Sequence, residues 1–238
     1  MKVLVGTAGF PASKKKVYSS VQLVELQTTF YNFPKPGTAA RWRAEAPEGF
    51  VFTLKASQLI THPPSSPTYR KAKLDIPPER RGAYGYFRPT PEVWEAWERT
   101  LEIAHLVEAE FIVFQTPASF STYPDALINL REFFSKVDSV GIKLGLELRG
   151  KWDRRALTRF FKEFNLIHVV DPFKEKPLWG DAVYYRLHGR GKGYAYDYSK
   201  EELLELKGML NPKKLNYVVF NNTQMLKNAV EFLRLLQS

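Results

Sequence analysis

The sequence predicts an α/β fold of the (β/α)8 TIM-barrel type, formed by a single domain over residues 1–238. Eight short apolar stretches have the length and composition of β-strands. Stretches with the apolar spacing of helices separate most of them, as expected for a barrel of parallel strands. No G-x-G-x-x-G follows the first strand, so a dinucleotide-binding open sheet, which uses the same alternation, has little support.

The first three strands are expected at residues 2–6, 23–29 and 50–56. Because successive side chains of a strand point to opposite faces, Glu25 and Gln27 share one face and Lys55 arrives near the end of its strand. A short helix is expected at 38–46. Residues 57–91 are rich in proline and contain His62, and we expect them to form a long insertion, a loop or lid, after the third strand.

The remaining strands are expected at residues 111–116, 143–149, 167–170, 182–190 (ended by Gly189) and 215–220. Helices are expected at 92–108 and 124–137 from their apolar spacing, at 153–164 after an Asp153 cap, at 199–210 and at 223–236. Ser199 and Glu202 have the spacing of a capping box. The proline-rich link 172–181 predicts a reduced or missing helix between the sixth and seventh strands.

Two strands carry charge on one face. In 143–149, Glu147 and Arg149 alternate with leucines, so the leucines are expected against the covering helices and the charges toward the barrel interior. In 182–190, Arg186 and His188 share a face, and the loop 190–198 that follows is basic and aromatic. Active sites of TIM barrels lie at the carboxyl ends of the strands, so these side chains are expected at the barrel mouth.

The composition restricts the function classes. The 35 Lys and Arg against 25 Asp and Glu give a net charge of +10, which favours anionic partners such as nucleic acid, phosphorylated metabolites or acidic membranes, although solubility alone also explains it. The absence of cysteine excludes disulfides, thiolate zinc sites and a cysteine nucleophile. No apolar run is long enough to span a bilayer, and the chain starts on a strand-like KVLVG, so we expect a cytoplasmic protein.

An ordered set of short motifs spans the chain. It consists of Gly6-Thr7-Ala8-Gly9, Glu25-x-Gln27-x-Thr29-Phe30-Tyr31, Trp42 with Pro47, Phe50, Phe52, Lys55 and Thr61-His62, Gln115-x-Pro117 with Phe120, Glu147-x-Arg149 with Trp152, Tyr185-Arg186-Leu187-His188-Gly189, and Phe220-Asn221-Asn222 with Asn228-Ala229. By this set the chain resembles the YecE-like family, a TIM-barrel domain of unknown function. The resemblance implies the barrel and carries no activity with it.

The candidate site combines acids, bases and cations from several strand ends. The predicted catalytic residues are Glu147, His188, Glu25 and Asp171, with a carboxylate as general base and His188 as acid or base. The predicted substrate-binding residues are Lys55, Gln115, Arg149, Arg186, Gln27, Tyr31, His62, Trp152 and Asn221. Cations suit a phosphate or carboxylate, so the leading hypothesis is a hydrolase or lyase acting on an anionic, phosphate-bearing substrate, with nucleic acid included.

Several alternatives stay open. Glu147 with Arg186, or Glu25 with Lys55, can simply form ion pairs that close the barrel top. A sugar or sugar-phosphate enzyme would use paired carboxylates, with Tyr31, Trp152, Trp179 and Tyr194 stacking on sugars. A divalent metal on Glu147, Asp171 and His188, with Glu25 or His62, is chemically possible but lacks a motif. The barrel can also be a non-catalytic binding protein, and the basic-aromatic residues 80–88 suit either single-stranded nucleic acid or a lid.

Overall fold

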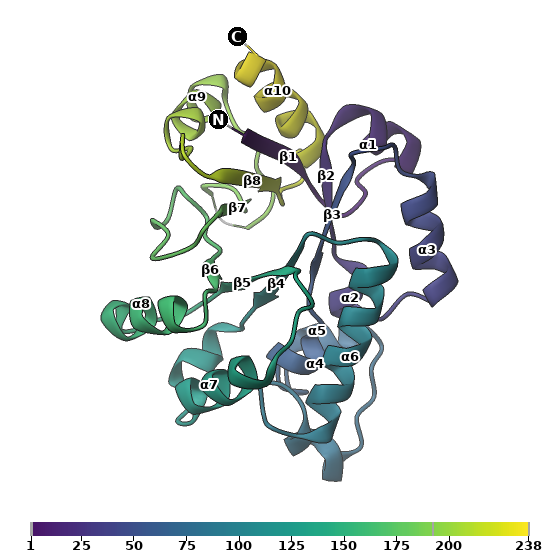
Figure 1. The fold of residues 1–238 in the computed structure, drawn as a ribbon, viewed down its shortest axis with the longest axis vertical. Coiled ribbons are helices and arrows are strands. Elements are labelled where there is room, and N and C mark those ends of the chain that lie inside the picture. Colours follow the sequence, from purple (N-terminus) through teal and green to yellow (C-terminus); the bar gives the residue numbers. More distant parts are fainter. Residues whose placement is uncertain (1, 192, 238) are drawn as a thin grey trace.

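Eight parallel strands form a nearly closed barrel in the computed structural model of the chain (Figure 1), which describes residues 2–191 and 193–237. Lys192, within the loop 190–198, lies outside the described residues. The strands are β1 (Lys2–Ala8), β2 (Leu23–Leu26), β3 (Val51–Lys55), β4 (Phe111–Gln115), β5 (Lys143–Glu147), β6 (Ile167–His168), β7 (Val183–Leu187) and β8 (Leu215–Phe220). Their order in the sheet is β6-β5-β4-β3-β2-β1-β8-β7, which confirms the predicted barrel.

The barrel closes at a narrow seam between β6 and β7. Strand β1 pairs with both β2 and β8, so the first and last strands are neighbours. Across the seam, a single bridge joins Val170 to Tyr185. The amide of Arg186 donates to the carbonyl of Val170 at 2.9 Å, and the amide of Val170 donates to the carbonyl of Tyr184 at 3.2 Å. The seam therefore ends one residue before Asp171.

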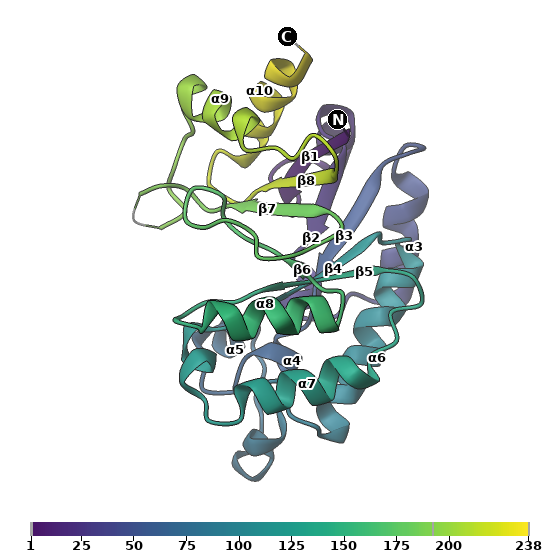
Figure 2. The ribbon, with the colours of Figure 1, turned by 60° about the vertical axis from the view of Figure 1, so that its left-hand side comes forward.

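Seven longer helices cover the outside of the barrel (Figures 1 and 2): α1 (Lys14–Ser20), α3 (Pro36–Glu45), α6 (Pro91–Leu106), α7 (Ala126–Lys136), α8 (Arg154–Glu163), α9 (Lys200–Gly208) and α10 (Met225–Gln237). The predicted capping box forms at the start of α9. The Ser199 hydroxyl accepts from the backbone amide of Glu202, and the Glu202 carboxylate accepts from the backbone amide of Ser199. Residues 172–181 contain no helix, as their prolines predict. Helix α1 was not among the predicted helices, because its basic start Lys14–Lys16 also suits an exposed loop.

Several strands end at other residues than predicted, and the ends of β2 and β5 change where two site residues lie. The strand expected over 23–29 ends at Leu26, because Thr28–Tyr31 forms the short helix α2, whose Thr29 hydroxyl donates to the carbonyl of Lys55 at 2.6 Å. The strand expected over 143–149 ends at Glu147. Gln27 and Arg149 therefore belong to the loops at the mouth and not to the strands.

Side chains alternate between an inner and an outer core as predicted. Val183, Tyr185 and Leu187 of β7 pack in the outer core under the helices, whereas Tyr184 packs inside the barrel, with its ring centroid 4.4 Å from that of Phe111. On β5, a Cβ at Gly145 would lie 2.5 Å from the Phe111 ring. The glycine thus makes room for an aromatic ring in the barrel interior.

The insertion 57–91 is more ordered than predicted. It contains the short helices α4 (Gln58–Thr61) and α5 (Pro67–Lys71) and the 3-10 turn η1 (Pro78–Ala83), and a second 3-10 turn, η2 (Ala118–Thr122), follows β4. Phe87 is fully buried, and the Tyr86 ring stacks on Phe120 at 5.4 Å. Arg88 lies over the Tyr86 ring and donates to the carbonyl of Tyr84. Phe87 is therefore part of the core and cannot stack on a nucleic-acid base, whereas Tyr86 packs against Phe120 but stays half-buried.

Candidate functional site

Arg186 lies at the centre of the barrel mouth and is completely buried. Its Nε and Nη2 donate to the Glu25 carboxylate at 2.8–3.2 Å. Its Nη1 donates to Gln115 Oε1 at 3.2 Å and to Glu147 Oε2. Tyr184 adds a hydroxyl bond of 2.8 Å to Glu25. Every guanidinium nitrogen of Arg186 thus has an acceptor, in a cluster that joins strands β2, β4, β5 and β7.

The opposite charges in this cluster favour each other's ionised form. Burial opposes the charge of Glu147, but the positive charge of Arg186, together with His188 and Arg149, holds the pKa of this carboxyl well below its usual range. Burial also opposes the charge of Arg186, and the carboxylates of Glu25 and Glu147 outweigh it and raise the pKa of the guanidinium. Both partners therefore stay ionised at neutral pH. Gln27 completes the cluster by donating from its amide to Glu25.

His188 follows β7 and is held by Asp171, which follows the seam. The Asp171 carboxylate accepts the backbone amide of His188 at 3.2 Å, and its Oδ2 lies 3.5 Å from His188 Nδ1. The other ring nitrogen, Nε2, is buried, lacks a hydrogen-bond partner and lies 3.7 Å from Glu147 Oε1. Because buried polar atoms normally find a partner, this unpaired nitrogen is a candidate for contact with a bound group.

A cavity of about 460 Å³ opens beside His188 at the carboxyl ends of β5 and β7. Its charged lining includes Glu147, Arg149, Asp171, Lys174, Glu175 and His188, and Tyr194 also lines it. Arg149 is 39% exposed, and its Nε lies 3.4 Å from Glu147 Oε1. Burial opposes the charge of Arg149, but Glu147 and a hydrogen bond with Tyr194 raise its pKa. The centroid of the Tyr194 ring lies 5.9 Å from that of the His188 ring, and the Tyr194 side chain is exposed.

Lys55 and His62 form a second part of the mouth. The Lys55 ammonium lies 3.6 Å from the centroid of the Phe30 ring, and no carboxylate of the described residues is within ion-pair distance of it. His62 shares a 2.8 Å hydrogen bond with the Thr61 hydroxyl. Burial, helped by the charges of Lys55 and Arg149, lowers the pKa of His62 to about 3, so its ring is neutral at pH 7.

The other predicted binding residues lie around this rim with clear structural contacts. The Trp152 indole N–H donates to the carbonyl of Arg149 at 3.0 Å and so fixes the loop that carries the guanidinium. The Tyr31 hydroxyl accepts from Lys71 at 3.2 Å. Asn221 follows β8, and its backbone amide donates to the carbonyl of Leu187 at 2.9 Å.

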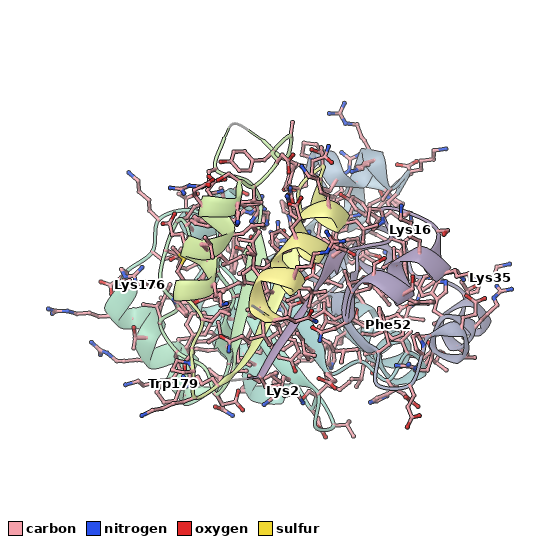
Figure 3. The ribbon with its side chains drawn as sticks, turned by 90° about the horizontal axis from the view of Figure 1, so that it is seen from above. Lys2, Lys16, Lys35, Phe52, Lys176 and Trp179 are labelled. Atoms are coloured by element: carbon pink, nitrogen blue, oxygen red, sulfur yellow. The ribbon has the colours of Figure 1, made fainter. Side chains whose placement is uncertain are left out.

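Trp179 does not belong to this site, in contrast to the expectation that it could stack on a sugar there. Figure 3 shows Trp179 at the same end of the molecule as Lys2, the first residue of β1, which is the amino end of the barrel. The Trp179 carbonyl accepts from the amide of His168 at 3.0 Å. The link 172–181 contains no helix and runs back along the barrel. Trp179 therefore lies at the amino end of the barrel, opposite the mouth that carries the candidate site.

Three contributors were not identified from the sequence: Tyr184, Lys174 and Glu175, of which the last two line the cavity. Tyr184 bonds both Thr53, at 2.7 Å, and Glu25, and its place on the Arg186 face of the strand was the available signal. Lys174 lines the cavity 3.7 Å from Asp171, but nothing in the sequence distinguishes it from other exposed lysines. Within residues 2–191 and 193–237, no group of three or more His, Asp or Glu side chains could hold a metal ion.

Comparisons with known proteins identify relatives of the whole chain. A family model described as "Protein of unknown function DUF72" matches residues 14–238. A DUF72 family protein from Enterococcus faecalis V583 has a similar structure, with a TM-score of 0.71, 19% identity, and coverage of 100% of this chain and 98% of that one. A DUF72 family protein from Thermotoga maritima MSB8 has a TM-score of 0.68 and 24% identity, and both chains are covered completely.

A more distant structure, a D-tagatose 3-epimerase-like protein, has a TM-score of 0.57 and 15% identity over 100% of this chain and 96% of that one, which indicates a shared fold. No curated protein matches the chain. Among the described residues, no helix is long and apolar enough to cross a membrane.

Proposed function

The chain belongs to the DUF72 family, the YecE-like proteins of unknown function, and we propose that it is a hydrolase or lyase whose substrate is an anionic, phosphate-bearing small molecule bound at the barrel mouth. The observation that carries this proposal is the buried, unpaired Nε2 of His188, next to a charged cavity. A fold of this kind hosts many chemistries, so the proposal depends on the site and not on the barrel.

His188 is the proposed general acid and base. The Asp171 carboxylate faces Nδ1 and favours the tautomer with the proton on that nitrogen, which leaves the lone pair of Nε2 to accept a proton from a bound substrate or water. Glu147, 3.7 Å from Nε2, stabilises the imidazolium that results. Asp171 acts through His188 and is a positioning residue. General acid–base catalysis by a histidine held in this way typically contributes about 10²–10⁴ in rate.

Arg149 and Lys174 are the proposed contacts for the substrate's phosphate. Both line the cavity and keep exposed side chains, at 39% and 60%. Arg186 has no exposed surface and all its nitrogens donate within the cluster, so we assign it to positioning Glu147 and Glu25. A cavity of about 460 Å³ falls in the range of small-molecule sites, roughly 300–1,000 Å³. Because Phe87 is buried and the half-buried Tyr86 ring packs against Phe120, we favour a small molecule over a polynucleotide.

A thermal-shift screen tests the binding part of the proposal. Sugar phosphates are each compared with the corresponding free sugar, and short single-stranded DNA is added at two salt concentrations. We expect a higher melting temperature with the phosphorylated compound only. Arg149→Gln should weaken binding about 10-fold or more, since a charged hydrogen bond contributes roughly 1.5–3 kcal/mol. Arg155→Gln removes the same charge from an exposed position on α8 and is the matched control.

Product analysis by mass spectrometry then tests catalysis with any compound that binds. His188→Asn should retain binding and lose turnover by about 10²-fold or more. Equal shifts with phosphorylated and free sugars, or equal effects of the two arginine variants, would contradict the assigned anion site. A salt-sensitive shift with DNA alone would replace the small molecule by nucleic acid.

A further inference from the structure

Lys55 is a largely buried lysine whose amine has no hydrogen-bonding partner among the described residues. It ends β3 at the mouth of the barrel, is only 6% exposed, and makes no hydrogen bond or ion pair through its side chain within the described residues. Its ammonium lies over the face of the Phe30 ring, 3.6 Å from the ring centroid. Lysine is almost never buried unless it is paired, so this position requires a reason beyond packing.

The surroundings hold this amine in place. The Thr29 hydroxyl donates to the backbone carbonyl of Lys55 at 2.6 Å, which fixes helix α2 and with it the Phe30 ring. The neighbouring carboxylates of Glu25 and Glu147 are taken by Arg186. The ammonium therefore lies close to two carboxylates without bonding either of them.

Electrostatics favour the neutral form of the amine. Burial and the charge of Arg186 lower the pKa of Lys55 to about 7. The carboxylates of Glu147 and Glu25 act in the opposite direction, and Arg149 lowers the pKa by a smaller amount. His62, the other titratable group beside it, is neutral at pH 7 and adds no charge. About half of Lys55 is then unprotonated at neutral pH, compared with well under 1% of an ordinary lysine with a pKa of about 10.4.

We propose that the Lys55 amine is a nucleophile that forms an imine with the carbonyl carbon of a phosphate-bearing aldehyde or ketone. This inference rests on the proposed function and narrows its substrate class from phosphate compounds in general to carbonyl compounds. Desolvated lysines beside other cations are the ones suited to Schiff-base chemistry. Such chemistry fits the lyase branch of the proposed function.

The step balances without a further reagent. The nitrogen lone pair attacks the carbonyl carbon, a C–N bond forms as the C=O π bond breaks, and one proton passes from nitrogen to the carbonyl oxygen. The resulting carbinolamine releases that hydroxyl with the second N–H proton as one molecule of water, leaving a C=N bond to Lys55, and the imine nitrogen takes up a proton from solvent. The protonated imine withdraws electrons from the adjacent carbon–carbon bond, and hydrolysis by water later restores the lysine. Nothing is oxidised or reduced in the sequence.

The test is borohydride trapping on the full-length protein. D-glyceraldehyde 3-phosphate and D-glyceraldehyde are incubated separately with wild type, Lys55→Arg and Lys162→Arg at pH 7, and each sample is reduced with sodium borohydride and mapped by peptide mass spectrometry. Lys162 is the matched control, because its ammonium also lies over an aromatic ring, that of Trp179 at 5.2 Å, but it is exposed and far from the mouth. Circular dichroism confirms that each variant is folded.

We expect the phosphorylated aldehyde to label Lys55 at least about 10-fold faster than Lys162, and the Lys55 label to be absent from Lys55→Arg, which keeps the cation but not the nucleophile. No excess labelling of Lys55 over Lys162, with phosphate binding intact in the thermal-shift screen, would overturn the imine and leave the proposed function standing. Equal labelling of Lys55 by both aldehydes would support the imine and contradict the phosphate site.

Discussion

Replacing Lys55 by methionine should stabilise the protein at pH 6, and this gain should disappear towards pH 10.5. Methionine fills the space of the lysine stem beside Phe30 but carries no charge. In the wild type, folding transfers a protonated amine from water to a buried position without an anionic partner. The variant removes this penalty, so the gain in stability exists only where the lysine is charged.

The size of the gain follows from the difference between the pKa of Lys55 unfolded, about 10.5, and folded, about 7. At 1.36 kcal/mol for each pH unit, this difference corresponds to roughly 5 kcal/mol below pH 7. Loss of one buried atom and of the contact with the Phe30 ring reduces the gain by about 1–2 kcal/mol. We therefore expect the variant to be more stable by about 3 kcal/mol at pH 6.

The sign of the pH dependence is specific. Between pH 7 and 10.5 the unfolded wild type binds more protons at this site than the folded protein, so its free energy of unfolding rises with pH, by at most about 1.4 kcal/mol per unit. The gap between variant and wild type closes over the same interval. Urea unfolding at pH 6, 7, 8, 9 and 10 measures it, with Lys162→Met as the exposed control. A variant less stable than wild type at pH 6, or a gap that does not change with pH, would refute the reasoning.

Three further outcomes are expected. Arg186→Met should destabilise the fold by roughly 3–5 kcal/mol in urea unfolding, because two buried carboxylates lose their counter-charge; a loss below about 1 kcal/mol would contradict the cluster. Asp171→Asn should lower turnover by about 10²-fold or more once a substrate is found, with KM little changed, because His188 loses the carboxylate that sets its tautomer; an unchanged rate would remove Asp171 from the mechanism. Gly145→Ala should destabilise the barrel by roughly 1–3 kcal/mol, because the new methyl group meets the Phe111 ring; wild-type stability would show that the ring can move aside.

Strand alternation was sufficient to predict the inner face of the site. The period of two along β7 and β5 places Arg186 and Glu147 inside and the intervening apolar residues outside, and the same rule applied to β2 places Glu25 with them. The rule holds for these three strands because their outward side chains are apolar and pack in the outer core under the helices. The partners in the buried cluster could therefore be chosen from the sequence, although its geometry could not.

The rest of the site depends on contacts between separate segments and on local structure outside the strands, which the alternation of side chains along a strand cannot predict. Asp171 meets His188 only because the seam brings two segments together, and β6 is too short to show this in its pattern. Gln27 turns inward from the start of a helix that was expected to be strand. For Tyr86 and Phe87, the same composition suits an exposed stacking surface and a packed one, so burial could not be predicted from residue types.

The narrow seam between β6 and β7 also affects the candidate site, because Asp171 directly follows the residue that closes the seam. Only two main-chain hydrogen bonds join Val170 to β7 in the described residues, whereas β1 and β8 share a register over six residue pairs. Local opening is easiest where few bonds must break, so amide hydrogens at the seam should exchange with solvent before those of β1 and β8. Because Asp171 directly follows Val170, we expect such an opening to separate Asp171 from His188, so that the proposed acid–base pair is complete only while the seam is closed.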